Sequence, residues 1–97
     1  MIDLPDPIPV FRDHFESIQL SDEEKADIEA TFKSLAKLLG KKIIGEDVEG
    51  QLKQVQAQAL LWKSGALATA YTAFWAAAEE YATRVGSVLL ATVKGLI

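Results

Sequence analysis

The sequence contains no cysteine, which excludes disulfides and thiolate metal sites. It has a single histidine, His14, with Asp13 and Glu16 nearby but no second histidine at helical or hairpin spacing. Its six glycines are scattered rather than gathered into a phosphate-binding loop. We therefore expect His14 to be a surface residue, and we predict no enzyme activity, no catalytic residue, no metal site and no cofactor.

Basic charge is also scarce, because the 97 residues carry a net charge of −4. The charge is uneven: residues 1–49 hold twelve acidic and six basic side chains, whereas residues 50–97 hold two acidic and four basic ones. A protein that binds nucleic acid usually presents a basic stripe to the phosphates. The composition therefore predicts no nucleic-acid partner.

Long hydrophobic runs are missing as well. The longest uncharged stretch, residues 64–78, is fifteen residues long, whereas a membrane-spanning helix needs about 20. The first residues are acidic and broken by proline instead of basic and then apolar, so we expect no signal peptide. These features predict a cytoplasmic or virion protein.

What the sequence does contain is helical periodicity, which predicts an all-α fold. Ser21 followed by Glu24 forms a capping box that starts a helix over residues 21–44. Gly45 ends it, and Asp47 begins a second helix over residues 47–96, with a possible kink at residues 64–65. All three prolines lie in residues 1–20, which we therefore predict to form an extended arm, with a short helical turn over residues 12–18 as an alternative. The arm packs either on its own domain or on a neighbouring subunit. The predicted fold is an antiparallel helical hairpin over residues 21–97.

The second helix is too long for its partner, about 70 Å against about 35 Å at 1.5 Å per residue. Its second half carries apolar residues at alternating steps of four and three, the pattern of a coiled coil. Either the chain bends at residues 64–65 and folds back as a third helix, or the overhang pairs with other subunits. We favour a coiled-coil or bundle homo-oligomer, with the following predicted interface: Leu67, Tyr71, Phe74, Trp75, Tyr81, Val85, Val88 and Leu89.

Two adjacent carboxylates, Glu79 and Glu80, interrupt this nearly uncharged helix. Neighbouring helical residues point about 100° apart, so the two cannot converge on one substrate. Glu80 and Arg84 have the spacing of a helical ion pair. We therefore predict that the carboxylates are exposed and keep this part of the helix solvated. The alternative is an ion pair of Arg84 that is buried between subunits.

One stretch resembles a known group of proteins. The segments Gly-Glu-Asp-Val-Glu at residues 45–49 and Gln-Val-Gln-Ala-Gln-Ala at residues 54–59 are similar to small helical proteins encoded by bacteriophages. The similarity covers about a quarter of the chain. It implies an origin in a mobile element and assigns no functional residue.

The main functional hypothesis is a non-enzymatic structural or assembly protein that self-associates through its C-terminal helix. The alternative is a small inhibitor or sequestering protein that binds a host protein, a virion protein or a small ligand through the acidic first helix or a pocket between helices. A third hypothesis is a membrane-active amphipathic helix over residues 85–97, which the small number of basic residues there disfavours.

Overall fold

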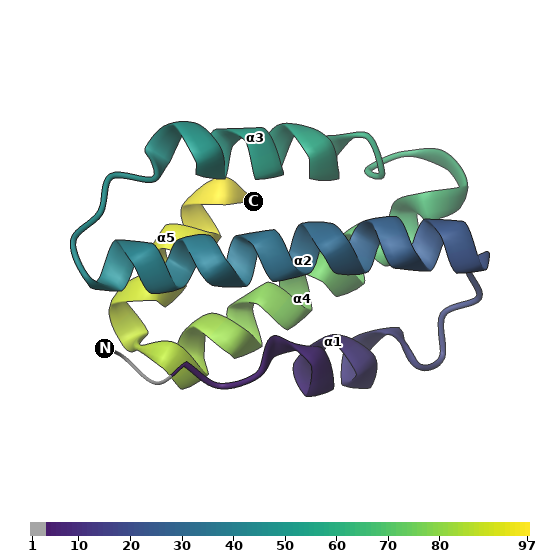
Figure 1. Ribbon diagram of the computed structural model, residues 1–97. Coiled ribbons are helices and arrows are strands. Elements are labelled where there is room, and N and C mark those ends of the chain that lie inside the picture. The colour runs from purple at the N-terminus through teal and green to yellow at the C-terminus, as the bar shows by residue number, and fades with distance from the viewer. Residues whose placement is uncertain (1–3) are drawn as a thin grey trace.

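The computed structural model describes residues 4–97 and confirms the all-α prediction (Figure 1). Within that range the chain forms five α-helices and one short 3₁₀ turn. Their bounds are α1 Pro7–Phe15, α2 Asp22–Ile43, α3 Glu49–Leu60, η1 Gly65–Leu67, α4 Ala68–Val85 and α5 Ser87–Leu96.

Helix α1 corrects the prediction of an extended arm over residues 1–20. The carboxylate of Asp6 caps the helix by accepting a hydrogen bond of 3.0 Å from the backbone N–H of Ile8. Pro7 and Pro9 both lie in the first turn, where the backbone N–H groups have no partner within the helix. Proline therefore starts this helix instead of preventing it. The first three residues of the predicted arm lie outside the described residues.

The capping box accounts for where α2 begins. The Ser21 hydroxyl accepts a hydrogen bond from the Glu24 N–H at 3.1 Å, and the Ser21 N–H donates to the Glu24 carboxylate at 3.0 Å. The hydrogen bond from the Ser21 backbone N–H lowers the pKa of the Glu24 carboxylate, and the side chain of Ser21 beside that carboxylate lowers it further. Gly45, whose φ of 93° suits glycine, ends the helix, and α3 then runs antiparallel to α2 (Figure 1).

The predicted helix over residues 47–96 is interrupted in the structure close to its possible kink at residues 64–65, and the chain folds back there instead of continuing as one long helix. The chain leaves the helix after Leu60, turns through residues 61–64 and enters η1 at Gly65, whose φ is 80°. It leaves the helix again at Gly86, which is extended, and α5 then packs against α4. Both breaks let the apolar side of the second half fold onto the first half of the chain. This burial stabilises the bent chain over one long helix with an exposed seam.

Aromatic rings hold the core together. Phe32 of α2 contacts Phe11 of α1 and Phe74 of α4, with ring centroids 5.5 and 5.8 Å apart. Trp62, in the turn after α3, packs edge-on against Phe74 at 5.3 Å. The cluster therefore joins α1, α2, α4 and the turn after α3, and fixes the direction in which the chain folds back.

Candidate functional site

The eight residues of the predicted oligomer interface do not form one surface in this fold. Four are buried in the core of the single chain: Phe74, Trp75, Tyr81 and Leu89. Three are half-buried, namely Leu67, Tyr71 and Val85. Val88 is 76% exposed. The periodicity therefore marks mainly the face that packs against α1 and α2, and self-association through this face stays a prediction.

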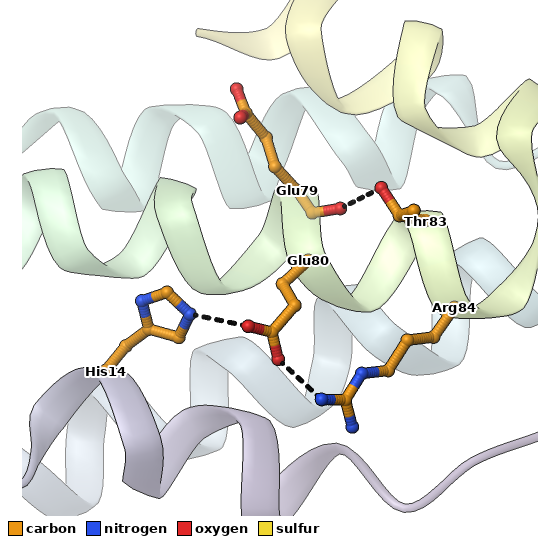
Figure 2. A network of polar contacts seen from close by, with 5 residues as sticks. All are labelled: His14, Glu79, Glu80, Thr83 and Arg84. Atoms are coloured by element: carbon orange, nitrogen blue, oxygen red, sulfur yellow. Dashed lines mark hydrogen bonds and ion pairs between the residues drawn. The ribbon is translucent and has the colours of Figure 1, made fainter.

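A polar cluster joins α1 to α4 (Figure 2). His14 Nε2 lies 3.3 Å from Oε1 of Glu80, and Nη2 of Arg84 lies 3.0 Å from Oε2 of the same carboxylate. Oε2 of Glu80 is buried and has no partner with hydrogen-bond geometry among the described residues. The ion pair with Arg84 therefore offsets the cost of burying this oxygen. Glu79 points away from the cluster, while the Thr83 hydroxyl donates to its backbone carbonyl at 2.9 Å. His14 is thus a half-buried partner of Glu80, with 27% of its side chain exposed, and the sequence did not predict this contact.

A second contact fixes the chain just before α1 to α4. The hydroxyl of Tyr81 donates a hydrogen bond of 2.8 Å to the backbone carbonyl of Pro5. Burial raises the pKa of Tyr81, and the negative charge of Asp6 raises it further. The tyrosine therefore stays a donor over the ordinary pH range.

The polar cluster contains one histidine–carboxylate pair, His14 and Glu80. A histidine–carboxylate pair can orient an imidazole as a base, but such a base needs a nucleophile or a bound water within reach. The hydroxyl of Thr83, one turn along α4 from Glu79, donates its hydrogen bond within its own helix. Residues 4–97 contain no group of three or more His, Asp or Glu side chains placed to hold a metal ion. The geometry therefore supports a structural role: the cluster holds α1 against α4.

A groove of about 460 Å³ lies between α2 and α3. Leu38 and Val55 are its most buried side chains and form its floor. The remaining lining residues are small or polar: Ala30, Thr31, Ser34, Lys37, Lys41, Gln51, Gln54 and Gln58. The glutamines recur at steps of three and four along α3, so all three face the groove. The sequence predicted no groove here, although the spacing of these glutamines was a signal for one polar face on α3.

The charge of the groove differs from that of the whole chain. None of the described residues that line it is acidic, whereas it holds two lysines. Neither Lys37 nor Lys41 lies within 4.0 Å of a carboxylate in the part of the chain that the structure describes. The groove therefore combines two cations, a row of amides and a narrow apolar floor. This combination can receive a polar surface that carries negative charge.

The exposed apolar residues are few and lie mainly near breaks between helices. Ile44 and Val88 are exposed near the ends of α2 and α4, and Leu61 follows α3. Among the described residues, no helix is long and apolar enough to cross a membrane.

Comparison of the chain with protein-family models, with curated proteins and with solved structures gave no match. The functional argument therefore depends on the geometry of the molecule.

Proposed function

We propose that this chain is a non-enzymatic interaction protein, a structural or assembly component, that associates with another polypeptide through the groove between α2 and α3. The observation that supports this proposal is the groove itself, with its unpaired Lys37 and Lys41 and its row of glutamines. The C-terminal helices supply less free surface, because Leu89 and Val93 of α5 are already buried against the rest of the chain.

A polypeptide fits the groove better than a small ligand does. Small-molecule sites of 300–1,000 Å³ are usually enclosed and mostly apolar. This groove falls within that range of volume, but Ser34, Lys37, Gln51 and Gln54 are all exposed. An open surface in which polar side chains surround a small apolar area is typical of contacts between proteins. The resemblance to phage proteins supports a virion or host protein as an alternative partner.

A photo-cross-linking residue placed at Gln54 tests the proposal, because this side chain stands on the groove wall. Lys53 is the matched control: it is adjacent, also exposed, and does not line the groove. We expect ultraviolet light to give a polypeptide adduct from position 54 and markedly less from position 53, measured by gel shift and mass spectrometry. Equal yields from the two positions, or no adduct, would contradict the proposal.

A further inference from the structure

Helix α2 carries one stripe of residues in which acidic side chains near the start of the helix are matched by basic side chains near its end. Along the exposed side, two acidic residues come first, small residues follow, and two lysines come last: Glu23, Asp27, Ala30, Ser34, Lys37 and Lys41. At 3.6 residues per turn, all six lie within about 40° of the direction opposite Phe32. Phe32 is buried in the core, so this stripe, hereafter the α2 stripe, points away from the chain's own core.

The spacing of the α2 stripe is symmetric about residue 32. Glu23 and Lys41 are each nine residues from that point, Asp27 and Lys37 are each five, and Ala30 and Ser34 are each two. When two copies of a helix pack antiparallel about a two-fold axis, residues at equal distances on opposite sides of the centre face each other. Each acidic residue of one copy would then oppose a lysine of the other.

The middle of the α2 stripe is suited to close approach. Ala30 and Ser34 are small and exposed, and both line the groove between α2 and α3. Small residues at a helix contact let the two backbones come near each other. The glutamines of α3 form the other wall of the groove and would meet the partner helix from the side.

The helix dipole does not account for this arrangement alone. The dipole favours acidic residues in the first turn and basic residues in the last turn, wherever they lie around the helix. Asp27 and Lys37 are both beyond the terminal turns of α2, yet both fall on the α2 stripe. The charges lie on one face beside the groove, as a surface that binds a second copy of itself requires.

We propose that the partner at this groove is a second copy of the chain, docked antiparallel through the α2 stripe about a two-fold axis near residue 32. This inference rests on the proposed function, since it names the polypeptide that the groove receives. Four ion pairs form across the dimer, two of each kind. Exposed ion pairs are individually weak and are screened by salt, so the dimer is salt-sensitive.

Charge reversal tests the pairing. The double variants K37E/K41E and E23K/D27K each turn the α2 stripe to a single sign of charge, so each alone should dimerise more weakly than the unaltered chain. An equimolar mixture restores all four opposite-charge pairs and should form a dimer containing one copy of each variant. We expect each reversal to raise the dissociation constant of the dimer at low salt by at least about tenfold. Sedimentation velocity measures this constant, and circular dichroism shows whether each variant is folded.

The matched control is K53E/K63E, which changes the net charge by the same amount at two exposed lysines outside α2. It should dimerise like the unaltered chain. A monomer at hundreds of micromolar in low salt would overturn the inference, as would a dimer that K37E/K41E leaves intact. An adduct from position 54 that contains a different protein would leave the proposed function standing while refuting the second copy as partner.

Discussion

Replacement of Phe74 by alanine tests whether the apolar face of α4 packs inside the single chain or against another subunit. Phe74 is fully buried, and its ring meets those of Phe32, Trp62 and Trp75 at centroid distances of 5.8, 5.3 and 5.0 Å. If α4 packs inside the single chain, the substitution opens a cavity that these rings cannot fill.

The expected cost is about 4 kcal/mol, within the range for a buried phenylalanine changed to alanine. For a chain of this size, that loss lowers the melting temperature by roughly 15–30 °C. Since small domains are stable by only about 5–15 kcal/mol, the variant should retain a small part of its stability.

Val88 provides the matched control, because it belonged to the same predicted interface but is 76% exposed. Val88→Ala should change the free energy of unfolding by no more than about 0.5 kcal/mol. The assay is urea denaturation followed by circular dichroism in about 1 M NaCl, where screening beyond about 3 Å suppresses pairing of charged surfaces. A loss at Phe74 below about 1 kcal/mol, or an equal loss at both positions, would refute the folded-back core.

Two further predictions concern turn geometry and a buried hydroxyl. Gly45→Ala should destabilise the chain by about 1–2 kcal/mol, because its φ of 93° is costly for any residue with a Cβ. Gly50→Ala should stabilise it by about 0.5 kcal/mol, since a Cβ there meets nothing within 4 Å in a helical turn; thermal melts of both variants decide whether the signs are opposite. Tyr81→Phe should cost about 1 kcal/mol through loss of the hydrogen bond to Pro5. The raised pKa of Tyr81 means that its proton is held more tightly in the folded state, so its contribution is complete below pH 10 and is lost as pH rises through the folded pKa. Alkaline unfolding that is identical with and without the hydroxyl would contradict this sign.

Local signals in the sequence predicted local structure well. The Ser21 capping box gave a helix over residues 21–44, and α2 spans Asp22–Ile43. The spacing of Glu80 and Arg84 predicted an ion pair that the structure contains. In both cases the interacting groups lie within one turn of a helix, so spacing alone determines the geometry.

The errors came from questions that periodicity cannot answer. Apolar periodicity shows which face of a helix is buried, but not whether the element packed against that face belongs to the same chain. Phe74 and Leu89 therefore suggested a second copy, although the partners belong to the same chain: α1 and α2 pack against the helix of Phe74, and α3 and α4 against that of Leu89. Proline suggested an extended arm because its position relative to the cap at Asp6 was not considered.

The candidate sites were the least predictable part of the molecule. His14 and Glu80 are 66 residues apart in sequence, and nothing in either segment signals the contact. The groove exists because α2 and α3 lie side by side, and its lysines and glutamines come from different helices. Only the spacing within each helix was available beforehand.

The contacts that fix the start of the chain to α4 also set an order of events during synthesis. Pro5 binds a side chain that lies 76 residues later in the sequence, and the aromatic residues of α1 depend on α4 for part of their cover. A ribosome adding about 5–20 residues per second needs roughly 4–15 s to make that interval. Residues 5–15 are therefore made before the helix that they pack against, and they can reach their final position only after α4 has been made. Until then Phe11 and Phe15 remain available to chaperones or to a wrong neighbour, so the folding yield of this chain should depend on how fast its second half is translated.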